Sequence, residues 1–478
     1  MQKLNVQTSI NDIYIGLSSP TLDDTPKFLS QLKEHIKLET LIPSSFYKAY
    51  YKDIGRPRGN KLESFIWFFQ LGNIIGIADD TVFLRVLQFS RELREFCEFK
   101  TVPKPSDLTT FRERFGGCIE LMFLNLVDIT EPICRKIDSK KSDYMIYDTT
   151  GIEANVKENN PKFMNTKLDQ AKKIAKKNPN YDPYKGVYSL LPEIAAANPN
   201  VKQQHINGHF CYAQKAGLLF NGLGIVRHIS FFDERFKDKH PDIVSKKTDN
   251  PDLDKEISDS TSLKPVLSDF FEAHPQFRDT YHTFLGDSSF DKYDNYKMLR
   301  DDFHFERICI PINPRNSKSA HTDFDENGTP VCPIDKTPFT FLGVSGGKNR
   351  SKRFKYVCHK SVKLKGSSKR VCSCETPCTP KSYGRCVYTY PHIELRLYPG
   401  IPRGTFHWDN LYRHRTLAER SINIFKSDFG VAKRRSFSSF SAKANLFLAG
   451  ITQLIAVILA VAINESKLFK SVRKLIVA

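Results

Sequence analysis

Cysteine and secretion signals are both scarce in this sequence. Eleven cysteines among 478 residues are too few for a disulfide framework. Residues 1–16 carry neither a basic leader nor an apolar signal core. These absences argue against a small secreted scaffold, and we expect a reducing, intracellular compartment, the cytoplasm. No repeat of fixed period is present, which argues against a solenoid.

Acidic residues are outnumbered by basic ones. The chain has 53 Asp and Glu against 72 Lys and Arg, which leaves a formal charge of +19. Such an excess favours a polyanionic partner, and nucleic acid is the commonest one. The hydrophobic content of 40% excludes a fully disordered chain, and 478 residues suffice for about three domains.

Long apolar runs are also rare. Residues 446–463 form the one stretch that approaches the length of a membrane span, and Thr452 and Gln453 interrupt it. A buried core helix and a spanning helix both fit this pattern. We favour the core helix, because nothing else in the chain indicates lipid.

The N-terminal part, residues 1–142, is predicted to be helical, because apolar residues recur at helical spacing between residues 60 and 135. Residues 102–106 resemble a loop, and Ser106 is a plausible N-cap for a helix presenting Thr110, Arg112 and Arg114. A DNA-reading helix-turn-helix and an all-helical dimerisation unit both fit.

Strand-like runs dominate the second part, residues 143–312. The pattern predicts strands at 144–150, 210–219, 224–232, 281–287 and 306–312, a hairpin turn at Gly222 and Gly224, and a helix at 291–303. This order predicts an α/β fold with a mixed sheet flanked by helices. The lysine-rich residues 156–207 would leave the sheet as an exposed excursion, which is either a solvated surface helix or a DNA contact.

The third part, residues 313–400, is predicted to be a Cys-rich, basic insertion. Ten Lys or Arg and no acidic residue lie between 348 and 370, interleaved with Phe354 and Tyr356, a composition suited to phosphates. Six cysteines also fall here. Structural zinc held by four thiolates and unliganded cysteines are the two interpretations. The candidate zinc ligands are Cys358, Cys372, Cys374 and Cys378.

The last part, residues 401–478, contains a segment with an unusual helical pattern at residues 411–429. On an ideal helix, Tyr412, Arg415, Glu419 and Lys426 fall within about 60° of one another. An apolar stripe lies directly beside them, formed by Leu411, Ala418, Ile422, Phe425 and Phe429. The pattern therefore predicts a charged site at the edge of a core.

Two aspartates end apolar strand-like runs and are candidates to meet Glu419. Asp148 follows residues 144–147, and Asp287 follows residues 281–286. Three carboxylates from two strands and a helix suit two Mg²⁺ ions. A single such aspartate is more often a turn residue or N-cap, so the hypothesis depends on all three.

Several nearby residues are given lesser roles. Glu153 lies an odd number of residues from Asp148, so it would face the other side of a strand. Asp291 and Asp294 are expected to cap the following helix. Trp408 is either a base-stacking side chain or, more simply, an interfacial aromatic.

The spacing Tyr412-x2-Arg415-x3-Glu419-x6-Lys426 resembles the Y-R-E-K signature of the DDE transposases encoded by bacterial insertion sequences, and all three gaps fit. The segments YDTTGIEAN, around Asp148, and LGDSSFDKYDNYKML, around Asp287, resemble that family's two aspartate motifs. The resemblance extends from about residue 50 to the C-terminus.

The resemblance implies a ribonuclease-H-like catalytic core whose glutamate-bearing helix follows an insertion, with a helical DNA-binding region near residues 60–120. It implies that Asp148, Asp287 and Glu419 bind divalent metal and are catalytic. Tyr412, Arg415 and Lys426 would contact phosphates of the transposon end.

We therefore expect a transposase that cuts at transposon ends and joins them to target DNA. The expected cofactors are two Mg²⁺ ions, for which Mn²⁺ can substitute, and a structural Zn²⁺. The expected partners are double-stranded DNA, both terminal inverted repeats and target, and a second copy of the chain in a synaptic homodimer associated with the nucleoid. The rival functions are a catalytically silent, domesticated DNA-binding protein and a nuclease or resolvase of the same fold.

Overall fold

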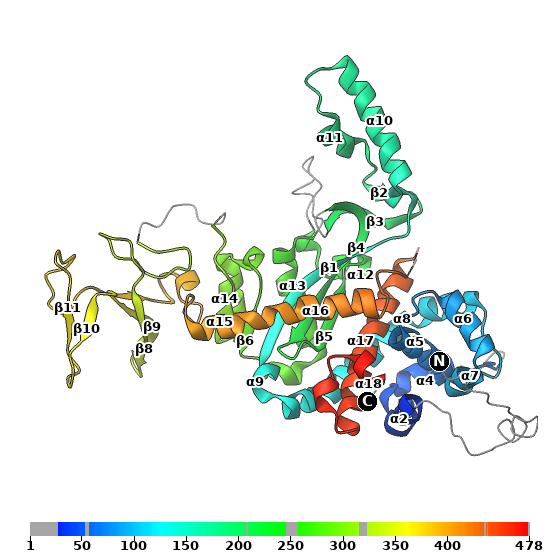
Figure 1. Ribbon diagram of the computed structural model, residues 1–478. Coiled ribbons are helices and arrows are strands. Elements are labelled where there is room, and N and C mark those ends of the chain that lie inside the picture. The colour runs from blue at the N-terminus through cyan, green and yellow to red at the C-terminus, as the bar shows by residue number, and fades with distance from the viewer. Residues whose placement is uncertain are drawn as a thin grey trace, which may run out of the picture.

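The protein is a mixed α/β molecule with two projecting parts (Figure 1). Its computed structural model describes residues 27–52, 57–206, 209–244, 257–314, 323–434, 436 and 438–476. The predicted split of the chain at residues 142, 312 and 400 stays a prediction. One buried hydrophobic cluster runs from Phe28 to Leu475, so N-terminal helices, sheet and C-terminal helices share a core.

The N-terminal part is helical, as predicted. Its helices are α2 (Lys27–His35), α3 (Leu38–Leu41), α4 (Ser44–Tyr50), α5 (Leu62–Ile75), α6 (Asp80–Phe89), α7 (Arg91–Cys97), α8 (Pro105–Ile137) and α9 (Ser139–Ser142). The predicted N-cap is wrong: α8 begins at Pro105, and the Asp107 carboxylate accepts the backbone N–H of Lys104 at 2.8 Å. Pro105 suits the first turn because the helix needs no N–H there.

Arg112 on α8 does not face DNA, which corrects its predicted role in a reading helix. Its side chain is buried, forms an ion pair with Asp80 and lies 4.6 Å from the ring centre of Phe69. Arg434 binds the same aspartate at 3.1 Å. This cluster ties α6 and α8 to the C-terminal part of the chain.

A seven-stranded mixed sheet forms the centre of the molecule. Its strands are β1 (Tyr144–Glu153), β2 (Ile194–Ala195), β3 (Asn198–Ile206), β4 (His209–Asn221), β5 (Val226–Phe231), β6 (Thr283–Leu285) and β7 (Arg307–Cys309). The order is β2-β3-β4-β1-β6-β7. β5 lies off this path and pairs with β4. β1 is antiparallel to β4 and parallel to β6, which is parallel to β7.

The predicted hairpin at Gly222 and Gly224 is confirmed as the β4–β5 connection. Gly224 has φ of +80°, a conformation that favours glycine. The Asn221 side chain accepts the backbone N–H groups of Leu223 and Ile225, both at 3.1 Å. The hairpin is therefore held by its own turn residues.

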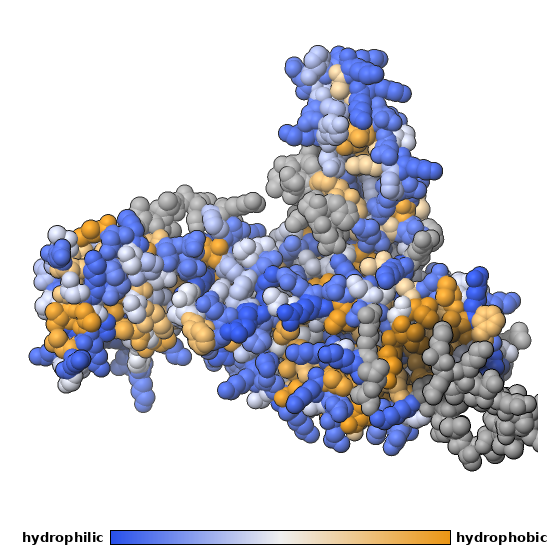
Figure 2. Space-filling model, viewed as in Figure 1, coloured by the Kyte–Doolittle hydropathy of each residue, from blue (hydrophilic) through white to orange (hydrophobic). Residues whose placement is uncertain are grey.

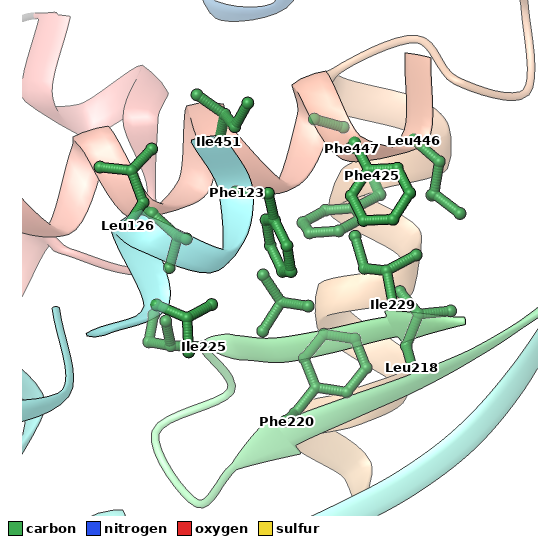
Figure 3. Packing of buried hydrophobic residues seen from close by; sticks show 14 of the residues in the cluster. Phe123, Leu126, Leu218, Phe220, Ile225, Ile229, Phe425, Leu446, Phe447 and Ile451 are labelled. Atoms are coloured by element: carbon green, nitrogen blue, oxygen red, sulfur yellow. The ribbon is translucent and has the colours of Figure 1, made fainter. Parts of the chain in front are cut away.

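Helices cover both faces of the sheet. α13 (Asp259–Ala273) packs on one face, where Tyr147 of β1 lies 2.7 Å from the Ser262 hydroxyl. α8 and α17 (Ser439–Ala462) cover the other face, and Figure 3 shows Phe123 of α8 and Phe447 of α17 meeting Ile229 of β5. The remaining helices of the body are α12 (Glu234–Lys239), α14 (Tyr293–Asp301), α15 (Phe406–Tyr412), α16 (Thr416–Asn423) and α18 (Val472–Ile476).

α17 is the long apolar helix predicted from residues 446–463. It is long and apolar enough to cross a membrane, but 89% of its apolar window is buried inside the protein. Thr452 hydrogen bonds to Gln70 and Asn73 of α5, both at 2.8 Å. Gln453 accepts the backbone N–H of Val226 at 2.8 Å. The two polar residues that interrupt the run therefore anchor a core helix to its neighbours.

The lysine-rich excursion divides into two parts. α10 (Pro161–Lys177) and α11 (Pro183–Gly186) project from the body and are largely hydrophilic (Figures 1 and 2). Ala171 is the one buried residue of α10, which supports a solvated surface helix. The rest of the excursion is not exposed loop, because β3 pairs with β4 and extends the sheet.

The second projection lies between β7 and α15. It contains β8 (Thr340–Gly347), β9 (Arg350–Val357), β10 (Ser361–Lys363), β11 (Arg370–Cys372) and β12 (Cys386–Thr389). Three of these strands form a small sheet in the order β12-β9-β8, and β10 and β11 form a separate hairpin. Residues 315–322, within the predicted insertion, lie outside the described residues.

Candidate active site

The register of two parallel strands brings the two aspartates together. Ile146 of β1 pairs with Leu285 of β6. Asp148 and Asp287 each lie two residues further along, so they occupy neighbouring positions at the point where β6 has ended. Adjacent strands lie about 4.8 Å apart. The sequence predicts that Asp148 ends its strand, and this is wrong, because β1 continues to Glu153. Asp148 lies instead just beyond the last residue of β1 that pairs with β6.

The segment carrying Glu419 is not one continuous α-helix, which corrects the prediction for residues 411–429. α15 ends at Tyr412, a 3₁₀ turn covers Arg413–Arg415, α16 covers Thr416–Asn423, and a π-helical turn covers Ile424–Asp428. The π turn changes the angle between Glu419 and Lys426, so the spacing alone does not give their relative direction.

The apolar stripe beside the charged residues is confirmed. Leu411, Ala418, Ile422, Phe425 and Phe429 are all buried. Phe425 packs against Phe220 of β4 with ring centres 6.4 Å apart, and the Ser421 hydroxyl donates to the carbonyl of Gly224. These contacts fix the segment across the face of the sheet and hold its polar side toward the aspartates.

The three carboxylates share one electrostatic environment. Burial raises the pKa of Asp148 to about 6; the hydrogen bond from the Thr149 backbone and the charge of Arg415 oppose the rise, and the negative charges of Asp287 and Glu419 add to it. Asp148 accepts the Thr149 N–H at 2.8 Å, and Asp287 accepts that of Ser289 at 2.8 Å. The negative charges of the three carboxylates therefore act on one another, and each aspartate also accepts a local backbone hydrogen bond.

Arg415 is a cation that interacts with all three carboxylates. Its guanidinium forms an ion pair with Glu419. Burial acts against its charge, but Tyr412, Glu419, Asp148 and Asp287 together raise the pKa of Arg415. Glu419 is therefore held by an arginine, with its side chain 49% exposed.

Tyr412 and Trp408 form the aromatic border of the site. Their rings are stacked with centres 4.6 Å apart, and Trp408 is buried. The structure therefore supports the simpler interpretation of Trp408, a packing aromatic. Burial raises the pKa of Tyr412, and Arg415 opposes the rise.

Lys426 lies at the other border. Burial lowers the pKa of Lys426, whereas the charge of Asp148 raises it, followed by those of Cys211 and Glu153. Glu153 is thus near this lysine even though its strand position differs in parity from that of Asp148. The alternation of side chains along a strand gives Glu153 a lesser role than Asp148. It does not predict that Lys426 interacts electrostatically with both acids.

Metal binding at the carboxylates requires their side chains to move closer together. Across the described ranges, no three His, Cys, Asp or Glu side chains are arranged to hold a metal ion. At the three carboxylates, two features explain this arrangement. Glu419 is paired with Arg415, and the three negative charges repel one another. The chemistry of the donors, three carboxylates with free oxygens, nevertheless fits Mg²⁺.

Asp291 is not a helix cap, which corrects that prediction. It is fully buried and accepts hydrogen bonds from Arg396, from the Tyr296 hydroxyl at 2.8 Å and from the Asn313 backbone at 2.6 Å. The first residue before α14 is Lys292, whose side chain makes no capping bond. Asp291 is therefore structural.

The basic stretch near β9 also differs from its prediction. Phe354 and Tyr356 are buried in the small core of the second projection, so they are not free to contact DNA. Arg353 packs over the ring of Tyr388 at 4.6 Å. A phosphate role for the remaining lysines and arginines stays a prediction.

Residues 20–114 match a family model described as "Transposase domain (DUF772)". No curated protein matches the chain. The matched region corresponds to the N-terminal helices, not to the carboxylates, and it supports a transposase in general terms.

Proposed function

We propose that the protein is a DNA transposase of the DDE type, which cuts the DNA strand at transposon ends and joins the freed end to target DNA. The observation that carries the proposal is the position of Asp148 on β1 beside Asp287 just after β6, with Arg415, the ion-pair partner of Glu419, interacting electrostatically with both aspartates. The mixed sheet with helices on both faces supports a ribonuclease-H-like core. The match to a transposase domain comes from a separate part of the chain and supports the same function.

Asp148, Asp287 and Glu419 would hold two Mg²⁺ ions, or Mn²⁺ in their place. When bound, such ions activate water, and then the freed 3′ hydroxyl, for in-line attack on phosphorus, and they neutralise developing charge. The chain supplies the rest. β1 and β6 fix the two aspartates, and the buried stripe of the α16 segment fixes the glutamate.

Arg415 and Lys426 are proposed to bind DNA phosphates. The Arg415 guanidinium is paired with Glu419. A phosphate entering the site would give the guanidinium a second anionic partner and release the carboxylate toward the metals. Tyr412, stacked on Trp408, would present its hydroxyl at the same border, where it can donate to a phosphate oxygen.

The proposed partners follow from the reaction. Cutting and joining require terminal inverted repeats and target DNA, and pairing two ends requires a homodimer in the synaptic complex. The net charge of +19 supports binding to double-stranded DNA. Association with the nucleoid is part of the same proposal.

The experiment uses labelled DNA ends from the element that encodes the protein, Mg²⁺ and a supercoiled target plasmid. We expect end binding, nicking and joined product with the natural chain. Asp148→Ala should bind ends but neither cut nor join. Cutting without joining would favour a nuclease or resolvase, and binding alone would favour a domesticated DNA-binding protein. Equal loss of binding and cleavage in Asp148→Ala would count against the metal assignment.

A further inference from the structure

The second projection, residues 323–398, has a very small hydrophobic core. That core consists of six buried residues: Cys332, Phe339, Phe354, Tyr356, Cys358 and Tyr398. Several large apolar side chains remain exposed instead: Ile334, Leu342, Val344, Val362, Leu364 and Val371. Figure 2 shows these apolar surfaces at the left of the molecule. A unit of this size with so little buried apolar surface generally needs a cross-link or a metal.

Two of the six core residues are cysteines, and each begins a tight turn. The carbonyl of Cys332 accepts the N–H of Lys336 at 2.9 Å, and its own N–H donates to Thr337. The carbonyl of Cys358 accepts the N–H of Ser361 at 2.9 Å. Cys332 and Cys358 are 4% and 1% exposed, so both thiols point into the core rather than toward solvent.

The segment after β11 brings further thiols to the same place. The N–H of Ser373 donates to the carbonyl of Lys360 at 3.0 Å, which sets Cys374 beside the turn that follows Cys358. Cys378 packs against the same small core. Cys378 is also within electrostatic range of Cys332 and Cys358, and Cys374 is within that of Cys358 and Cys372.

We propose that Cys332, Cys358, Cys374 and Cys378 bind one structural Zn²⁺ ion that holds the second projection together. The set spans three chain segments, and the Cys374-x3-Cys378 spacing is one that zinc sites use. Four thiolates in a tetrahedron suit zinc, and the four thiol protons pass to the buffer when the ion binds.

The proposal replaces one ligand of the sequence-based set. Cys372 lies on β11 opposite Ser361, and one residue separates it from Cys374, a shorter spacing than is typical of zinc sites. Cys332 takes its place, although it lies 26 residues before Cys358 (358 − 332). Cys386 is left out because it lies on β12, opposite Val357 of β9, and outside the three segments that carry the other thiols.

The site requires the four thiols to move closer together. Each of the four thiolates would supply one sulfur ligand to the ion. The closing of the turns at 332 and 358 onto the 374–378 loop would then stiffen the whole projection.

The test is zinc content of the full-length protein, purified without chelator and measured by inductively coupled plasma mass spectrometry. We expect about one zinc per chain. Cys332→Ser, Cys358→Ser, Cys374→Ser and Cys378→Ser should each lower this to below about half, whereas Cys372→Ser and Cys386→Ser, the matched controls, should keep it. Less than about half a zinc in the natural protein would overturn the proposal. Loss in Cys372→Ser with retention in Cys332→Ser would overturn the ligand set.

A second measurement does not depend on variants that fold. The natural protein, stripped of zinc and titrated with Co²⁺ alone, should develop the strong ultraviolet thiolate-to-metal band and visible bands of a tetrahedral site. Titration with a mercurial reagent should then release the metal as four thiols react. A spectrum of six-coordinate Co²⁺ would contradict the proposal. Neither readout depends on DNA cleavage, so failure here leaves the transposase proposal untouched.

Discussion

Asp287 and Asp291 lie four residues apart in the sequence but differ in burial and in hydrogen-bond partners. Asp291 is fully buried, and Arg396, Tyr296 and the Asn313 backbone satisfy its oxygens. Asp287 is partly exposed, and its described hydrogen bonds come from Ser289, two residues away. Asp291 is therefore a carboxylate that holds the fold, whereas Asp287 is held only by local hydrogen bonds and lies beside Asp148.

The same contrast recurs on a larger scale. Glu131 lies inside a closed network, where it accepts hydrogen bonds from Arg227 at 3.3 Å and from the Tyr281 hydroxyl at 2.8 Å. Asp148 lies in an open one, with two like charges and one arginine near it. A buried carboxylate whose partners are all in place stabilises the fold. A carboxylate beside other negative charges is repelled by them, and a bound cation would reduce that repulsion.

The largest effect is expected when Asp287 loses its charge. Asp287→Asn should reduce strand cleavage at transposon ends by about 1,000-fold or more, because one proposed metal ligand is weakened. End binding, measured by gel shift, should stay within about threefold of the natural protein, about 0.6 kcal/mol. Cleavage near the natural rate would remove Asp287 from the site.

The matched change in the closed network should do the reverse. Asp291→Asn leaves the Arg396 guanidinium without its buried partner, so we expect the free energy of unfolding to fall by about 3–5 kcal/mol. Denaturant unfolding measures this loss. The cleavage rate per folded molecule should change little. A variant that is stable but inactive would show that Asp291 belongs to the catalytic group.

Asp148→Asn should stabilise the protein while it abolishes cleavage. Folding raises the pKa of Asp148 from 3.8 to about 6, so the ionised form is disfavoured in the fold. The penalty is absent below about pH 4, grows through the interval up to about pH 6, and is complete above it. At pH 7.5 without divalent metal, we expect the variant to be more stable by up to about 3 kcal/mol.

Unfolding curves at pH 7.5 and pH 4 check this linkage, since the difference between variant and natural protein should disappear at the lower pH. A variant that is less stable than the natural protein at pH 7.5 would mean that the carboxylate is satisfied, like Asp291. Added Mg²⁺ should raise the stability of the natural protein alone.

The smallest effect concerns Lys426. Lys426→Ala should weaken end binding and reduce the slope of log affinity against log salt by about 0.9, the value for one phosphate contact. Lys467→Ala, an exposed lysine far along the chain, is the control and should leave the slope unchanged. An unchanged slope in Lys426→Ala would exclude the phosphate contact.

Much of the fold follows from local pattern. The helices of the N-terminal part, the β4–β5 hairpin and the buried α17 are predicted by apolar spacing and turn residues, because these elements depend on neighbours along the chain. The end of a strand is different. β1 continues past Asp148 because β4 still pairs with it, and nothing local to Asp148 signals that partner.

The sequence predicts which residues belong to the candidate site better than it predicts how they are arranged. Spacing picks out Tyr412, Arg415, Glu419 and Lys426, but the 3₁₀ and π turns between them arise from packing against the sheet, which no periodicity shows. The same limit explains Arg112, whose partner Asp80 is 32 residues away. Buried charge pairs formed across the fold leave no local signal.

Asp148, Asp287 and Glu419, three acids distant in sequence, are proposed to line one metal site. Fe²⁺ substituted for Mg²⁺, with ascorbate and peroxide, cleaves a polypeptide near the bound ion, and mass spectrometry locates the cuts. We predict cuts clustered near residues 148, 287 and 419, suppressed together by excess Mg²⁺. Cuts at one of these segments alone, or cuts that Mg²⁺ does not suppress, would contradict the account.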